Sequence, residues 1–80
     1  MIKMRDVGNN LRLSRVVIGM TQQEVADRLG LPRTAIGKIE RGEQDVSAIH
    51  FYEMTRMYGR SADLELFLEE SFFHELPKHL

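Results

Sequence analysis

The stretch TQQEVADRLGLPRTAIGKIERG, residues 21–42, decides the fold of this chain, because it has the pattern of two short helices joined by a tight turn. Thr21 can cap a helix that begins at Gln22. Its hydroxyl can accept from the amide of Glu24, while the Glu24 carboxylate accepts from the Thr21 amide. Gly30 falls where the chain must leave this helix with a positive φ.

The second helix of the stretch follows from the next residues. Leu31 is an apolar plug, and Pro32 has its φ preset for a first helical turn. This helix runs to Arg41, and Gly42 closes it. A period of 3.6 residues predicts inward positions at Val25, Ala26, Leu29, Ile36 and Ile39. The same period predicts outward positions on the second helix at Arg33, Thr34, Gly37 and Lys38.

These residues resemble the helix-turn-helix family of phage lambda repressor and Cro, also called the Xre-type family. The resemblance covers about residues 7–68 and is carried by the TQ at 21 and 22, Ala26, Gly30 and the IERG that ends at Gly42. It implies an all-α, lambda-repressor-like DNA-binding domain with the motif at its second and third helices. In that family the second helix of the motif, here Arg33 to Arg41, enters the major groove while the first crosses the backbone.

Outside the motif the pattern predicts three more helices and no strand, so we expect five helices in one domain over residues 1–80. The first spans about Arg5 to Ile18 and ends at Gly19. Its inward residues are predicted to be Val7, Leu11 and Ile18, assisted by Val16 or Val17. Met20 then packs as an apolar residue.

The fourth helix is predicted over about residues 48–58, with Ser47 as its cap and Gly59 as its end. One face carries Ala48, Phe51, Thr55 and Tyr58, with Met54 beside it. The fifth helix spans about residues 62–75, between a Ser61 cap and Pro77.

Helices four and five are expected to form a dimer interface. The apolar residues of the fifth helix do not fit one stripe, and an uncovered apolar patch on a small domain usually marks a partner surface. We predict a self-complementary contact with a second copy through Leu66, Phe67, Glu70, Phe73 and Leu76. The alternative is a wider intramolecular core with scattered exposed apolar side chains.

Charge is divided unevenly along the chain, although the net charge is only −1. Residues 1–42 carry eight basic and four acidic side chains, a net of +4, whereas residues 43–80 carry three basic and eight acidic side chains, a net of −5. Phosphates would orient the positive half toward a duplex. A chance split on a solvated surface is the alternative.

Base-reading and phosphate-binding residues are predicted separately, because they do different work. Arg33 is the first outward residue of the reading helix, and a guanidinium can take both O6 and N7 of guanine. The base-reading candidates are Arg33, Thr34, Ala35 and Lys38. The phosphate candidates are Gln22, which the family uses in that way, Arg41 and Arg12. Plain surface roles for Gln22 and Arg33, and a packing role for Ala35, remain alternatives.

An internal ion pair between Arg15 and Glu40 is implied by the family resemblance, and it would tie the first helix to the reading helix. The alternative is two independent exposed charges. Two positions depart from the family pattern. Pro32 stands where Ser or Thr often caps the reading helix, which leaves its first amides without a side-chain acceptor. Gly37 replaces a side chain that often reaches the groove.

Other classes of function have little support in the sequence. There is no cysteine, which fits a reducing cytosol, and there is no leader or membrane-spanning run, so a cytoplasmic protein is expected. His74, Glu75 and His79 do not have the spacing of a metal site, and His50 is expected at the surface or at an interface. No nucleophile and base are paired, so we expect neither catalysis nor a cofactor.

The sequence therefore predicts a sequence-specific, homodimeric transcriptional regulator, a repressor or autoregulator that binds double-stranded DNA at two half-sites one helical turn apart. Two alternatives stay open. One is an antitoxin whose tail binds a toxin while the motif binds its own promoter. The other is a protein-interaction adaptor that keeps the fold without binding DNA.

Overall fold

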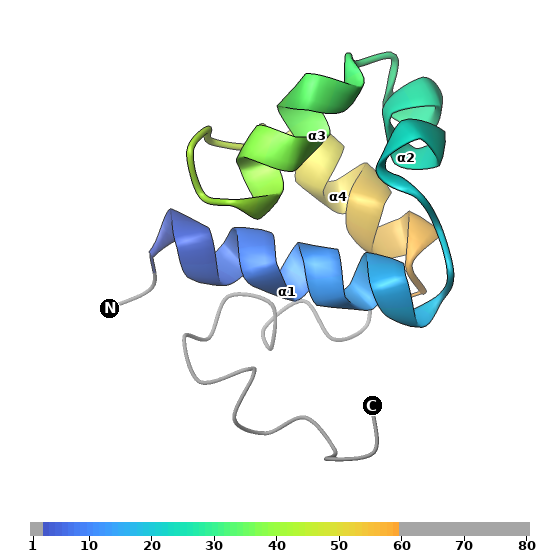
Figure 1. The fold of residues 1–80 in the computed structure, drawn as a ribbon, viewed down its shortest axis with the longest axis horizontal. Coiled ribbons are helices and arrows are strands. Elements are labelled where there is room, and N and C mark those ends of the chain that lie inside the picture. Colours follow the sequence, from blue (N-terminus) through green and yellow to red (C-terminus); the bar gives the residue numbers. More distant parts are fainter. Residues whose placement is uncertain (1–2, 60–80) are drawn as a thin grey trace.

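A computed structural model describes residues 3–59 of the chain. This part contains four helices, α1 (Met4–Val17), α2 (Gln22–Leu29), α3 (Arg33–Glu40) and α4 (Ala48–Met57). α3 packs against both α1 and α2, and α2 also contacts α4. α1 runs beneath the other three helices (Figure 1). The all-α class is confirmed. The predicted fifth helix and its interface residues lie outside the described residues.

Local rules account for the ends of α2. The Thr21 side chain accepts from the Glu24 amide at 3.1 Å, and the Glu24 carboxylate accepts from the Thr21 amide at 2.9 Å. This contact with Thr21 lowers the pKa of Glu24 below its ordinary value. At the other end Gly30 has φ of 68°, a left-handed conformation that glycine adopts without steric cost. The cap and the turn predicted for α2 are therefore confirmed.

The core lies where the four helices meet. Its members are buried apolar side chains from every helix and from the residue that ends α4: Val7, Leu11, Val25, Ala26, Ile36, Ile39, Met54 and Tyr58. Leu29, Leu31, Met20 and Phe51 are half-buried against it. Burial raises the pKa of the Tyr58 hydroxyl, and the negative charge of Glu40 raises it further.

Several predicted inward positions are wrong. Val16, Val17 and Ile18 are exposed, because they lie at the end of α1, beyond Ser14, the last buried residue of that helix. Ala48 is exposed because it is the first residue of α4 and precedes the part of that helix that covers the core.

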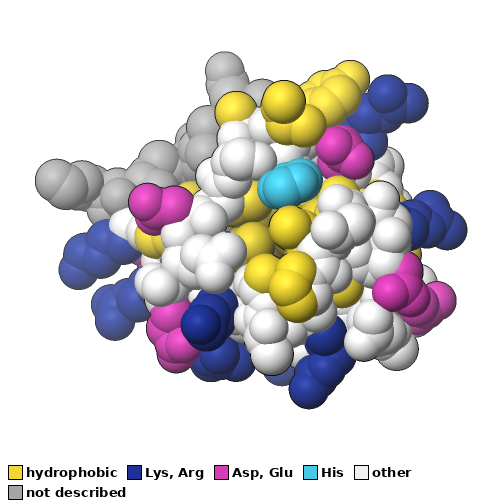
Figure 2. Space-filling model, turned by 90° about the horizontal axis from the view of Figure 1, so that it is seen from above, with side chains coloured by type: hydrophobic (Ala, Val, Ile, Leu, Met, Phe, Trp, Pro, Cys, Tyr) yellow, Lys and Arg dark blue, Asp and Glu magenta, His cyan; other side chains and the backbone are white. Residues whose placement is uncertain are grey.

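Hydrophobic side chains also remain visible on the face seen from above (Figure 2). Among residues 3–59 the large exposed ones include Ile49, at 71% exposure, and Tyr52, at 54%. None of the helices in this part of the chain has the length and apolar character needed to cross a membrane.

Candidate nucleic-acid interface

The outer face of α3 carries the predicted base-reading residues. Arg33, Thr34 and Lys38 are exposed, and Ala35 is half-buried. Pro32 precedes the helix with φ of −67° and offers no side-chain cap, as the sequence predicts. The first amides of α3 therefore have no side-chain acceptor from the N-cap residue, and an external acceptor such as water or a phosphate can serve them.

Gly37 departs from its predicted outward position, because the structure buries it. Gly37 lies four residues beyond Arg33 on the same face of α3, but the guanidinium of Arg41 covers it. A Cβ atom added at Gly37 would lie 3.1 Å from Nη1 of Arg41. Arg41 is thus folded back over the reading helix rather than extended beyond its end.

A buried carboxylate lies behind this face. The side chain of Glu40 is 1% exposed and that of Arg15 is 12% exposed. Nε of Arg15 donates to Oε2 of Glu40 at 2.7 Å, and Nη2 donates to Oε1 at 3.1 Å. The structure therefore brings together the two residues that were expected to pair, in the bidentate arrangement that a planar guanidinium favours.

The contacts of Glu40 extend to the start of α2 and the start of α3. Nε2 of Gln22 donates to Oε1 of Glu40 at 3.0 Å, and Nη1 of Arg33 donates to Oε1 of Gln22 at 3.1 Å. Nη1 of Arg15 donates to the carbonyl of Met20 at 2.7 Å. We call these five residues the Glu40 network. It fixes the Gln22 amide, because only its NH₂ can face the carboxylate and only its oxygen can face the guanidinium.

The network places Gln22 differently from the sequence analysis. The family resemblance implied that Gln22 binds a phosphate, but its side-chain amide here bridges Glu40 and Arg33. Gln22 is half-buried and lies next to Arg33, at the edge of the outer face of α3. Sequence reasoning missed this bridge, because it depends on contacts between residues 11 and 18 positions apart.

Two concavities flank α3. The first, about 520 Å³, lies beside the start of the helix and is lined by residues that include Gln22, Thr21 and Arg33. The second, about 370 Å³, lies beside its end and is lined by residues that include Arg5, Arg12 and Arg41. Both are bordered by arginine side chains, which attract an anion, and the second is also lined by the carboxylates of Asp6 and Glu40. Arg5 was not singled out from the sequence, although it lies in the positive half of the chain.

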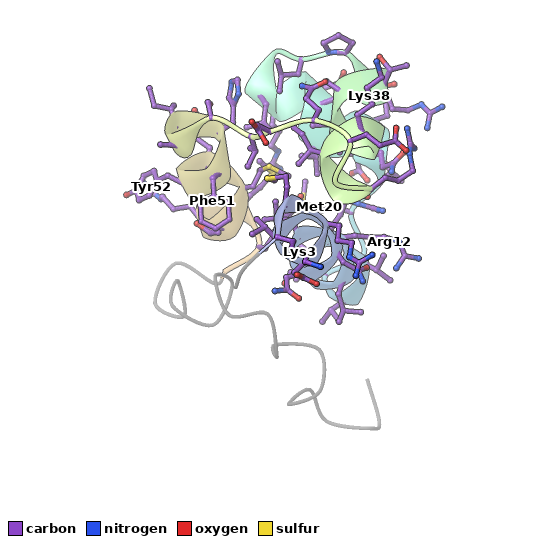
Figure 3. The ribbon with its side chains drawn as sticks, turned by 90° about the vertical axis from the view of Figure 1, so that its left-hand side faces the viewer. Lys3, Arg12, Met20, Lys38, Phe51 and Tyr52 are labelled. Carbon is purple, nitrogen blue, oxygen red and sulfur yellow. The ribbon has the colours of Figure 1, made fainter. Side chains whose placement is uncertain are left out.

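Two of the predicted DNA-contacting residues share one side of the molecule. Lys38 and Arg12 point toward the same side, whereas Tyr52 points toward the opposite side (Figure 3). Arg56 lies over the ring of Tyr52, 5.8 Å from its centroid, and so belongs to the opposite side. Within residues 3–59, no three His, Asp or Glu side chains gather in a metal-binding cluster. His74, Glu75 and His79 lie outside that part, and His50 is half-buried.

Comparison with known proteins gives two matches. A family model described as helix-turn-helix matches residues 11–64. The chain is also similar to an uncharacterized HTH-type transcriptional regulator of Methanothermobacter thermautotrophicus (strain Delta H), with 33% identity over 58 residues, which are 72% of this chain and 84% of that protein. No solved structure matches the chain.

Proposed function

The chain belongs to the helix-turn-helix family, and from this premise we propose that it is a sequence-specific DNA-binding transcriptional regulator that acts as a homodimer. The observation that carries the proposal is the outer face of α3, which is exposed among the described residues, is cationic, and is flanked by two arginine-bordered concavities. An α-helix with such a face fits the major groove, and the flanking cations are placed to meet the phosphates on either side.

Each side of α3 has a distinct role in this proposal. Arg33 contacts guanine, Thr34 and Lys38 contact neighbouring bases, and the Ala35 methyl packs beside them. Gln22 keeps its hydrogen bond to Arg33, and a phosphate binds in the first concavity, which Gln22 helps to line. Arg12 and Arg5 contact a phosphate through the second concavity. The Glu40 network then holds Arg33 in position before DNA arrives, which lowers the cost of ordering that side chain on binding.

Removal of the Arg33 side chain is expected to weaken discrimination at one base pair of each half-site by roughly 10- to 100-fold, the equivalent of a bidentate contact worth about 1–3 kcal/mol. The measurement is selection of bound duplexes from a random library, followed by titration of the selected site with wild type and with Arg33→Ala. Gln22→Ala is expected to weaken binding to all duplexes and, because it removes the hydrogen bond that holds Arg33, to weaken the preference at the Arg33 base pair by less than Arg33→Ala does.

Arg56→Ala is the matched control, because it removes the same charge from the opposite side of the molecule. It should leave both affinity and preference unchanged. The logarithm of the wild-type association constant should fall linearly with the logarithm of salt concentration. Salt-independent behaviour, or binding to a protein alone, would instead support the adaptor alternative, and co-purification of a second small protein would support the antitoxin.

Homodimerisation gives a separate expectation. We propose that two copies bind half-sites about 34–36 Å apart, one helical turn of DNA, and act as a repressor or autoregulator. The contact would involve Leu66, Phe67, Glu70, Phe73 and Leu76, which lie outside the described residues. Light scattering across concentration should report twice the chain mass, and a monomer at tens of micromolar would contradict this part of the proposal.

A further inference from the structure

Arg41 occupies a place on α3 that its sequence position does not indicate. The residue follows the last turn of the helix, where its side chain was expected to meet a phosphate. Its guanidinium lies instead over Gly37, with Nη1, Cζ and Nη2 at 3.1, 3.8 and 3.9 Å from the position that a Cβ atom would take there. The guanidinium therefore fills the space that a side chain at position 37 would occupy, one turn back along the outer face.

Glu43 holds the guanidinium in this place. Nε of Arg41 donates to Oε2 of Glu43 at 2.9 Å, and Nη2 donates to Oε1 at 3.2 Å. The Glu43 amide donates in turn to the carbonyl of Lys38 at 2.9 Å, which ties Glu43 to α3. The hydrogen bond from Arg41 lowers the pKa of the Glu43 carboxyl, so the pair is ionised at neutral pH.

We propose that Arg41 reads a guanine from the middle of α3, with Gly37 as the seat of its guanidinium and Glu43 as a positioning residue. The inference rests on the DNA-binding function proposed above. Two of the five N–H donors of Arg41 are directed to Glu43, and three remain. Those on Nη1 and Nη2 form a fork that matches the O6 and N7 acceptors of guanine in the major groove.

The position of Gly37 sets the spacing of the two guanidinium contacts. Gly37 is four residues beyond Arg33, and an α-helix rises about 1.5 Å per residue, so the two contacts are about 6 Å apart along the helix. Base pairs in DNA are about 3.4 Å apart. Where α3 follows the groove, Arg33 and Arg41 therefore contact guanines about two base pairs apart in the same half-site.

Neighbouring charges support a base contact over a phosphate contact for Arg41. The ionised carboxylate of Glu43, at 55% side-chain exposure, would repel a phosphate that approached the same guanidinium from its side. Arg5 and Arg12 line the concavity at the end of α3 together with Arg41 and can meet a phosphate there. The Arg41 guanidinium over Gly37 is therefore available to contact base edges in the major groove.

The test compares base preference in the whole chain. Duplexes selected from a random library by wild type, Arg33→Ala and Arg41→Ala are sequenced, and the selected sites are titrated at several salt concentrations. We expect Arg33→Ala and Arg41→Ala each to lose preference, by roughly 10- to 100-fold, at a different G·C pair, and these pairs to lie about two steps apart. Arg41→Lys should weaken the same preference while retaining the salt dependence, because an ammonium lacks the planar fork.

Gly37→Ala tests whether the space above Gly37 positions the Arg41 guanidinium, and it removes no charged group. The added methyl displaces the Arg41 guanidinium, so the preference assigned to Arg41 should weaken while that assigned to Arg33 persists. Its melting temperature should be equal to or higher than that of wild type, which excludes misfolding as the cause.

Two results would overturn the inference about Arg41 alone: a uniform loss of affinity in Arg41→Ala with a salt slope smaller by about one, which indicates a phosphate contact, or no loss at all. In both cases the preference lost in Arg33→Ala would remain, and the proposed function would stand. Absence of salt-dependent DNA binding by wild type would overturn the proposed function and this inference together.

Discussion

Replacement of Gly8 by alanine is expected to destabilise the domain by about 3 kcal/mol or more, the upper end of what overpacking costs. Gly8 lies on α1 where that helix crosses the end of α3. A Cβ atom at this position would overlap the carbonyl oxygen of Ile39 and lie 2.9 Å from that of Glu40. These are backbone atoms, so the helices can accept the methyl only by moving apart, and the core side chains between them would then lose contact.

The size of this effect matters because a chain of 80 residues has little stability to lose. Small domains bury only roughly 60% of the surface that their unfolded chains expose, and net stabilities start at about 5 kcal/mol. Urea and thermal unfolding followed by circular dichroism should show a large fall in midpoint, with the far-ultraviolet signal weakened at 37 °C.

Gly37→Ala is the matched control for Gly8→Ala. Both substitutions add one methyl in the interior of a helix, where alanine is favoured over glycine by about 1 kcal/mol. At Gly37, however, the neighbour is the flexible end of the Arg41 side chain rather than backbone. The two variants should therefore shift stability in opposite directions. A melting temperature for Gly8→Ala within a few degrees of that of Gly37→Ala would show that α1 and α3 are not in close contact.

The contrast between these glycines also shows what the sequence could predict. Gly30 was identified correctly, because a positive φ at the end of a helix is a local requirement. The close approach at Gly8 depends on the crossing of two helices about 30 positions apart in the chain, and no pattern near residue 8 indicates it. Ile18 fits the period of α1 yet is exposed, because periodicity does not tell where the neighbouring helix ends.

The candidate interface divides in the same way. The face of α3 followed from helical periodicity, and the proximity of Arg15 and Glu40 followed from the family resemblance. The bridge made by Gln22 could not be predicted in either way, because a glutamine amide can bind a phosphate or two protein partners, and the sequence does not distinguish them. The place of Arg41 over Gly37 also depends on side-chain folding rather than on spacing. Sequence patterns assign residues to faces, whereas hydrogen-bonding partners across helices come from the structure.

Truncation of Glu40 is expected to destabilise the domain by about 3–5 kcal/mol, the range for removal of one partner of a buried ion pair. Glu40→Ala would leave the guanidinium of Arg15 largely buried without a counter-charge, and it would also remove the acceptor of the Gln22 amide. Arg33 would then lose its indirect tie to the core, so we expect DNA specificity to fall even at temperatures where Glu40→Ala remains folded.

A double-mutant cycle separates the pair from the individual side chains. Arg15→Ala leaves Glu40 as a carboxylate that is almost fully buried and has lost its counter-charge, although it keeps its contact with Gln22, so this variant should also be strongly destabilised. The double variant removes both charges, and its loss should be smaller than the sum of the single losses by about 0.5–3 kcal/mol, the range for residues in contact. Urea unfolding at constant ionic strength gives these differences directly.

Glu43→Ala provides the control for the loss of a glutamate. It removes a carboxylate from an ion pair in which both side chains are more than half exposed, and such pairs contribute little to stability. Its melting temperature should therefore match that of wild type. If Glu40→Ala also matched wild type, or if the Arg15 and Glu40 losses simply added, the buried network would not be what holds α1 against the reading helix. The orientation of Arg33 toward DNA would then need another physical cause.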